Sequence, residues 1–544
     1  MKRFSKAVTL LLTAAMLMSV FAACGKKGAD PAATDTTAAR TTAAATTAGT
    51  DESTAGTDAS TAEKPHITFM TTDHYGTALT NKGADEVKKV YEEYTNTIVD
   101  WTWVSNDNYE DVLGITLMDK QNMPMVLTIT GTIMSPAVIQ AAKNDAFWDL
   151  NQFIWDAEKY PNLSQANKDV CKSYTLDGKL IGLYRARDIG RNGLGYRTDW
   201  AEKLGLDVPK TIEDVYNMAY QFTYGDPDGN GKDDTYGISM CKFTGPIDIV
   251  QAWFGAGNGW TDRDGKLVPV HMTEEYMEAV NWFKRMYDEK LIYEDWAVRD
   301  TIAWKDYVRN GECGMFLDVL DTSRSIWDYF IDNKIPSVSN PDEYAGMTLV
   351  GGIAKDANSE PVTLATSGAN GYFVLSKAAC KTEEDVETCL RFLDKMNDPE
   401  MVLLGEYGLE GKDWEYGDDG LVHDLQSAAQ AGERSSSGLN QCQTFVPGKN
   451  DLPVARTERV QLEMDIKKAN IDIAVFNPAM GYLANSATYA ENGGDLDDIL
   501  LSARTQYICG NIDQEEFQKQ LDLWLSRGGQ AVIDEVNEQY QADK

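Results

Sequence analysis

The chain has 544 residues, which suggests two to four domains at roughly 150 residues per domain. Hydrophobic residues make up 43% and charged residues 25%, close to globular averages, so a wholly disordered or fibrous chain is excluded. Asp and Glu number 85 against 50 Lys and Arg, and the net charge of −35 would repel phosphate backbones. The composition therefore predicts a globular protein that does not bind nucleic acid.

The N-terminus begins with a basic segment that is followed by an apolar one. Three basic residues among the first six precede the apolar residues 7–20, a run too short for a good membrane span. The run ends at Phe21, Ala22, Ala23 and Cys24, and small residues before a Cys resemble a bacterial lipobox. The alternative is an ordinary secretory signal with a chance Cys. We expect cleavage after residue 23 and a lipid on Cys24, which would anchor the chain to the outer face of the cytoplasmic membrane.

Residues 24–65 read as a disordered tether between this anchor and the body. Ala and Thr supply 23 of the 36 residues from 28 to 63, and aromatic residues are absent there. Such a stretch cannot bury enough apolar surface to offset its ordering entropy. A helix built on the Ala residues is the alternative, but the interspersed Thr, Gly and Asp disfavour it.

Strands and helices alternate from residue 66 onward. The expected strands are 66–70, 98–104 and 125–129, and the helices between them are 83–94 and 109–120. This order favours an α/β fold with a parallel, doubly wound sheet and ligand sites at the strand carboxyl ends. A second series is expected from about 194 to 350, followed by a strand at 371–375, a helix at 383–395 and a helical tail at 495–540.

Several residues beside these strands could contact a ligand. His74 and Tyr75 follow the first expected strand, and Thr130 follows the third. Arg185 and Arg187 come directly after another probable strand and stand out in an acidic chain, so they could line a crossover between lobes. The alternative for both arginines is a surface ion pair with a neighbouring Asp or Glu.

Aromatic residues are abundant, with 13 Trp, 25 Tyr and 16 Phe. The face of an aromatic ring suits the C–H face of a sugar, whose hydroxyls suit Asp, Asn and Arg. Trp253 and Trp260 stand in a Gly- and Asn-rich context and are the candidates for such stacking. Core packing is the alternative for each ring.

One loop has the spacing of a calcium site. Side-chain oxygens stand at loop positions 1, 3, 5 and 9, which are Asp226, Asp228, Asn230 and Asp234. Gly at position 6 permits the sharp turn, and Lys232 at position 7 would contribute its carbonyl. Position 12 is Gly237 and not the Glu of a true EF-hand, so further ligands must come from elsewhere. The loop predicts a structural Ca²⁺, and an acidic turn without metal is the alternative.

Motifs of enzymes are scarce. The chain has four His and lacks H-E-x-x-H, G-x-S-x-G and G-x-x-x-x-G-K-[ST]. A glycosidase carboxylate pair stays open, because 85 carboxylates make chance pairs common. Seven Cys remain besides Cys24 without any C-x-x-C, so at least one thiol is unpaired.

Several blocks resemble the family 1 extracellular solute-binding proteins, the sugar-binding lipoproteins of ABC importers, in their Gram-positive form. They are Asp177–Leu183, Tyr196–Thr211, the loop Asp226–Asp234, Tyr407–Asp413 and the tail from Tyr507 to Tyr540. The resemblance implies a type II periplasmic-binding-protein-like fold with two α/β lobes that close on ligand about crossover hinge segments. Lobe 1 would hold 66–184 and 365–413, and lobe 2 would hold 185–352 and 430–544 with the C-terminal helices.

The function implied by the resemblance is capture of a carbohydrate, an oligosaccharide, in the interlobe cleft and delivery to the ABC permease subunits. We expect a non-enzymatic monomer on the cell surface. Two alternatives stay open: a surface-anchored glycoside hydrolase, and a receptor for another solute such as a peptide.

Overall fold

The computed structural model describes residues 64–73, 84–105, 108–119, 121–132, 134–301, 303–425, 438–448 and 452–544. The predicted signal peptide, Cys24, the tether and the candidate residues His74 and Tyr75 lie outside these ranges. Within them, no helix combines the length and the apolar character that a membrane crossing requires.

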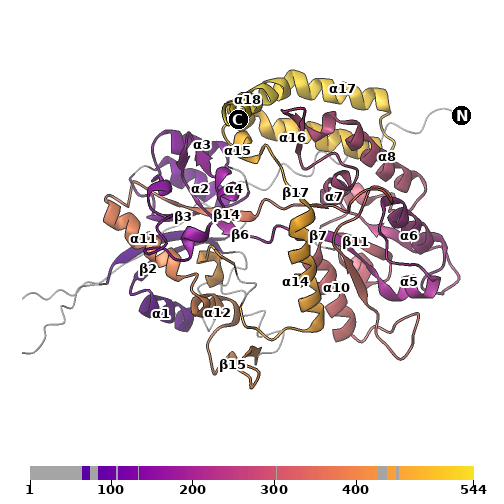
Figure 1. The fold of residues 1–544 in the computed structure, drawn as a ribbon, viewed down its shortest axis with the longest axis horizontal. Coiled ribbons are helices and arrows are strands. Elements are labelled where there is room, and N and C mark those ends of the chain that lie inside the picture. The colour runs from indigo at the N-terminus through magenta and orange to yellow at the C-terminus, as the bar shows by residue number, and fades with distance from the viewer. Residues whose placement is uncertain are drawn as a thin grey trace, which may run out of the picture. The chain divides into compact units, whose positions relative to one another are not determined.

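The first sheet has five strands in the order β2-β1-β3-β14-β6 (Figure 1). Their bounds are β1 His66–Asp73, β2 Ile98–Ser105, β3 Val126–Ile129, β6 Leu183–Ala186 and β14 Ala369–Leu375. Strand β1 pairs in parallel with β2 and β3, as the sequence predicts, but β14 runs antiparallel to both β3 and β6. The sheet is therefore mixed and not purely parallel.

Helices cover both faces of this sheet. In Figure 1, α2 (Tyr109–Met118), α3 (Pro136–Lys143) and α4 (Lys168–Lys172) lie on one face, and α1 (Ala84–Tyr94) and α12 (Pro399–Tyr407) lie on the other. The remaining elements here are α11 Glu383–Lys395, β4 Thr175–Leu176, β5 Lys179–Leu180, β15 Trp414–Tyr416 and β16 Val422–Asp424. Phe69 and Phe373 are fully buried between the layers in the core that we call lobe 1. Cys442 and Val446 also pack in this core, whereas the sequence analysis expected residues from 430 onward in lobe 2.

The second sheet has four strands in the order β12-β7-β11-β8. Their bounds are β7 Asn192–Arg197, β8 Tyr236–Ser239, β11 Cys313–Val319 and β12 Met347–Val350. The helices of this part, lobe 2, are α5 Thr198–Leu204, α6 Ile212–Tyr224, α7 Gly245–Trp253, α8 Glu274–Asp288, α9 Asp306–Arg309 and α10 Leu320–Asp332. A capping box of Thr211 and Asp214 begins α6 and satisfies two of its free backbone N–H groups.

A buried ion pair stabilises the start of α5. Arg197 donates from Nε and Nη2 to the two carboxylate oxygens of Asp199, at 2.8 and 2.7 Å. The two side chains are only 4% and 3% exposed, and Asp199 also accepts the backbone N–H of Val338 at 3.1 Å. The charge of this arginine is therefore fully matched inside lobe 2.

Three chain segments cross between the lobes side by side. The N–H of Arg187 donates to the carbonyl of Gly368, and the N–H of Thr366 donates to that of Ile189, both at 3.0 Å. Strand β13 (Thr363–Leu364) then pairs in parallel with β17 (Ala474–Val475). Helix α14 (Glu458–Asn470) presses on the first crossover so closely that a Cβ on Gly190 would lie 2.3 Å from a backbone oxygen.

The C-terminal helices form a third packed cluster. They are α15 Met480–Leu483, α16 Ala487–Ile508, α17 Gln514–Trp524 and α18 Gln530–Ala542, and α16 also contacts α8. Their apolar faces enclose the hairpin of β9 (Trp260–Arg263) and β10 (Lys266–Pro269) around Leu267 and Trp524. The helical tail predicted from the sequence is confirmed.

Candidate functional site

A cavity of about 580 Å³ lies beside the first crossover segment, and we call it the arginine cavity. Its walls come from the end of α12 and from residues 440–448 of lobe 1, and from α10 and α14 beside lobe 2. Six basic side chains line it: Arg185, Arg187, Arg191, Arg324, Arg456 and Lys467. The sequence predicted two of them, Arg185 and Arg187, as ligand residues, and the structure brings these two together.

The basic residues on the lobe 2 side are neutralised by carboxylates. Arg191 and Lys467 contact the Asp321 carboxylate at 3.1 and 2.8 Å, and Lys467 lies 3.4 Å from Asp188. Arg324 pairs with Glu463, a neighbour of Lys467 on α14. Burial alone would raise the pKa of Asp321, but hydrogen bonds and charge from Arg191 and Lys467 hold it well below its ordinary value.

Arg185 has no such partner. Its side chain is 4% exposed, and Nε donates to the carbonyl of Gln443 at 3.3 Å. Its Nη2 is buried without a hydrogen-bond partner in the described part of the chain. Burial, with the positive charge of Arg187 beside it, lowers the pKa of Arg185 to about 9. This guanidinium therefore keeps an unused hydrogen-bond donor in the wall of the arginine cavity.

Arg187 extends the same positive region. Its Nη1 donates to the carbonyl of Ala186 at 3.0 Å, and burial lowers its pKa, with Arg191 as the next cause. Among residues with described positions, no carboxylate forms an ion pair with Arg185 or Arg187. The alternative that the sequence left open for these arginines, surface ion pairing, is thus not what the structure shows.

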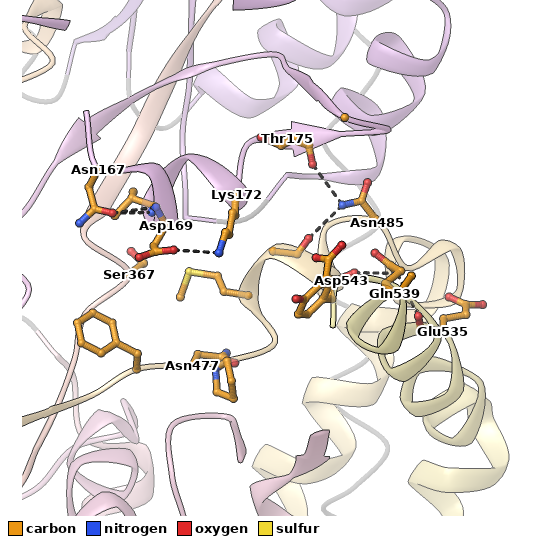
Figure 2. Close-up of a pocket in the computed structure, with 18 of the residues that line it drawn as sticks. Asn167, Asp169, Lys172, Thr175, Ser367, Asn477, Asn485, Glu535, Gln539 and Asp543 are labelled. Atoms are coloured by element: carbon orange, nitrogen blue, oxygen red, sulfur yellow. Dashed lines mark hydrogen bonds and ion pairs between the residues drawn. The ribbon is translucent and has the colours of Figure 1, made fainter. Parts of the chain in front are cut away.

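A larger cavity of about 1000 Å³ lies near α4, α15 and α18 and is drawn in Figure 2. Asn167, Asp169 and Lys172 come from the α4 side, and Asn485, Glu535 and Gln539 face them from the C-terminal part of the chain (Figure 2). Several of these polar groups already hold the fold together. Asn167 caps α4, and Glu535 accepts from the N-terminal residues Ser486 and Thr488 of α16. We therefore take the arginine cavity, with its unsatisfied donor, as the candidate site.

Thr130 lies at the carboxyl end of β3, where the sequence predicted a ligand contact. Its hydroxyl donates to the carboxylate of Glu110 on α2, and its side chain is half-buried. Its role toward a ligand stays a prediction.

The two predicted stacking rings are packed inside the protein. Trp253 is 1% exposed in the core of lobe 2, and Trp260 is 6% exposed against the C-terminal helices. We correct the ligand assignment of both to core packing, because a ring enclosed by its own chain offers no face to a sugar.

The predicted calcium loop gathers its oxygens around Asn230. The Asn230 amide nitrogen donates to the carboxylates of Asp228 and Asp234 at 2.7 and 3.0 Å, and Asp226 accepts the N–H of Gly231 at 3.2 Å. Positive φ angles at Asp226, Gly229 and Gly231 make this tight turn possible.

The donor set of this loop fits a hard cation in chemistry, because it consists of carboxylate, amide and carbonyl oxygens. No group of three His, Cys, Asp or Glu side chains converges at metal-binding distance within the described ranges. The Lys232 carbonyl and the Asn230 oxygen would therefore be needed to complete the coordination.

No family model matches the chain. It is 36% identical over 463 residues to lipoprotein LipO of Bacillus subtilis (strain 168), an alignment that covers 84% of this chain and 89% of LipO. It is 29% identical over 500 residues to the polygalacturonan/rhamnogalacturonan-binding protein YtcQ of the same organism, with 91% and 95% covered.

Solved structures share the fold. An HMO-binding ABC-transporter-associated solute-binding protein from Bifidobacterium longum infantis superposes with a TM-score of 0.66 at 18% identity, over 88% of this chain and 99% of that one. An EF-hand mutant of the ABC-transporter substrate-binding protein FusA of Streptococcus pneumoniae, in complex with fructo-nystose, reaches 0.62 at 17% identity, over 88% and 100%. With the LipO relationship and this two-lobed fold together, the chain belongs to the family of extracellular solute-binding proteins.

Proposed function

We propose that this protein captures an oligosaccharide in the arginine cavity and delivers it to the permease of an ABC importer. The observation that carries the proposal is a cavity of ligand size at the crossover segments, bordered by elements of both lobes and holding an unsatisfied buried donor. YtcQ is a polygalacturonan/rhamnogalacturonan-binding protein and the FusA structure holds fructo-nystose, and both relatives support this ligand class.

In this mechanism the protein binds and releases its ligand without chemical change. Guanidinium donors hold the ligand's oxygens, and rotation of the lobes about the crossover segments encloses it. The permease then recognises the ligand-loaded form. Cys24 carries the lipid that keeps the protein at the outer face of the membrane, as the name of the lipoprotein relative suggests.

We further propose that the loop 226–234 holds a structural Ca²⁺. Asp226, Asp228, Asn230 and Asp234 would supply side-chain oxygens, and Lys232 its carbonyl. The cation would offset the mutual repulsion of the carboxylates in this loop. The FusA structure described as an EF-hand mutant supports such a site in a protein of the same fold.

A thermal-shift screen of the mature chain with Cys24→Ser tests the ligand class. Neutral and acidic oligosaccharides are compared with peptides at fixed Ca²⁺. A ligand at 100 times its Kd adds about 2.7 kcal/mol of stability, which raises the Tm by several degrees. A shift with one sugar class supports the proposal, whereas a shift with peptides alone contradicts it.

The hydrolase alternative is tested on the same samples. Bound oligosaccharide should be recovered intact after prolonged incubation, because a transport receptor returns its ligand unchanged. Release of new reducing ends in proportion to protein concentration would instead identify a glycosidase.

A further inference from the structure

Arg185 carries a charge that the fold leaves unmatched. A buried ion is stable in a protein when it is paired and its hydrogen-bonding capacity is used. Arg185 is as buried as Arg197, at 4% exposure, yet only Arg197 has a carboxylate partner. The protein has 85 Asp and Glu residues against 50 Lys and Arg, so the composition does not limit the number of carboxylates that could pair with Arg185. The absence of a carboxylate partner for Arg185 among the described residues is therefore specific to this site and does not follow from the overall composition.

The carboxylates that line the arginine cavity are engaged elsewhere. Asp321 and Glu463 contact Arg191, Arg324 and Lys467, and Asp188 lies near Lys467. Glu406, the fourth, accepts from the side chain of Asn440 at 3.1 Å. The cavity therefore has six basic and four acidic lining side chains, and its excess of positive charge is concentrated at Arg185 and Arg187.

We propose that the ligand of the arginine cavity is an acidic sugar whose uronate carboxylate binds to Arg185 and Arg187. This inference rests on the proposed function and narrows it to one chemical class. A planar guanidinium fork and a planar carboxylate match in two parallel hydrogen bonds, and the second arginine adds charge. A neutral hydroxyl would satisfy the free donor at Nη2 but would add no negative charge to that of Glu406, which acts on both arginines from nearby. The uronate carboxylate supplies both a hydrogen-bond acceptor for Nη2 and a negative charge beside the two arginines.

The test compares charged and uncharged versions of one sugar by isothermal titration calorimetry on the mature chain with Cys24→Ser. The probes are the trimers of galacturonate and mannuronate, their methyl esters, and the trimers of galactose and mannose. We expect at least one uronate trimer to bind, and its methyl ester to bind at least about tenfold more weakly, as the loss of a charge-assisted hydrogen bond predicts.

Variants assign the effect to the two arginines. Arg185→Met and Arg187→Met should each weaken uronate binding by about tenfold or more, and Arg185→Lys should restore part of it because it keeps the charge without the fork. Arg391→Met is the matched control, since Arg391 is half-exposed on α11, and it should change nothing.

The outcomes separate this inference from the proposed function. Tight binding of the neutral trimers together with no binding of the uronates would overturn the acidic-sugar inference and leave carbohydrate capture standing. Equal affinity for acid and ester, or uronate binding that Arg185→Met leaves intact, would also overturn it. A folded protein that binds none of the sugars but binds peptides would overturn both.

Discussion

Replacing Arg185 by Met should leave the ligand-free protein at least as stable as the parent. The long apolar stem is kept, while the buried charge is removed. A tenfold change in a proton-binding constant corresponds to about 1.4 kcal/mol, so a pKa that falls from 12.5 to about 9 corresponds to roughly 5 kcal/mol against the charged form. The hydrogen bond from Nε to Gln443, about 1.5–3 kcal/mol, is lost in return. We expect a net gain of about 2–3.5 kcal/mol in the free energy of unfolding.

Arg197→Met is the comparison that makes this prediction specific. Arg197 has the same exposure, but its removal leaves Asp199 buried and unpaired, which typically costs about 3–5 kcal/mol. Thermal unfolding of both variants is followed by circular dichroism at pH 7 without ligand. Arg185→Met should melt at or above the parent temperature, and Arg197→Met several degrees below it.

If Arg185→Met melted as far below the parent as Arg197→Met, the reasoning would be refuted. Arg185 would then be part of the scaffold, with its charge satisfied in the folded state, and its unmatched charge would no longer indicate a ligand. A stable variant that has lost ligand binding is the outcome expected of a residue kept for function.

Three further predictions concern other parts of the chain. Chelation of Ca²⁺ by EGTA should lower the Tm of the parent protein, while Asp228→Ala should melt at the chelated value and not respond to EGTA; an unchanged parent Tm would argue for a metal-free turn. Burial raises the pKa of Asp318 from 3.8 to about 6, so the folded state loses stability as pH rises from about 4 to above 6. Asp318→Asn should therefore stabilise the protein at pH 8 by at most about 3 kcal/mol, which raises the Tm, and should leave the Tm unchanged near pH 3.5. Equal effects at both pH values would contradict this prediction. Cys24→Ser should release the protein into the medium and abolish incorporation of labelled fatty acid, and retention with label would refute the lipobox.

The secondary structure of lobe 1 could be predicted well from the sequence, because its strands are short apolar runs between helices of clear periodicity. Strand β1 is predicted at 66–70 and observed at His66–Asp73, and α11 has the predicted bounds. The sequence predicted a parallel sheet and missed that β14 is antiparallel to its neighbours β3 and β6. The direction of β14 depends on where the chain re-enters lobe 1 after lobe 2, and the hydrophobic pattern of the strand itself does not show this.

The site was predictable only in part. Arg185 and Arg187 stand out in the sequence as cations after a strand in an acidic chain, and they do line the cavity. The prediction of Trp253 and Trp260 as ligand residues was wrong, because a Gly-rich sequence context does not show which residues pack over a ring. Trp260 is buried by the C-terminal helices, which lie far along the chain. The contribution of α14 through Lys467 was missed too, as its partners Asp188 and Asp321 are distant in sequence.

The interleaving of the two lobes sets an order of events during export. Strand β3 is buried along its whole length and needs β14 as its neighbour on one side. Every residue of lobe 2 up to β12 leaves the secretion channel before β14 does, so β3 would meanwhile expose an apolar edge capable of pairing with another chain. The sheet of the first lobe to emerge is thus completed only after the whole sheet of lobe 2 has emerged, and in this interval the newly exported protein is most vulnerable to aggregation.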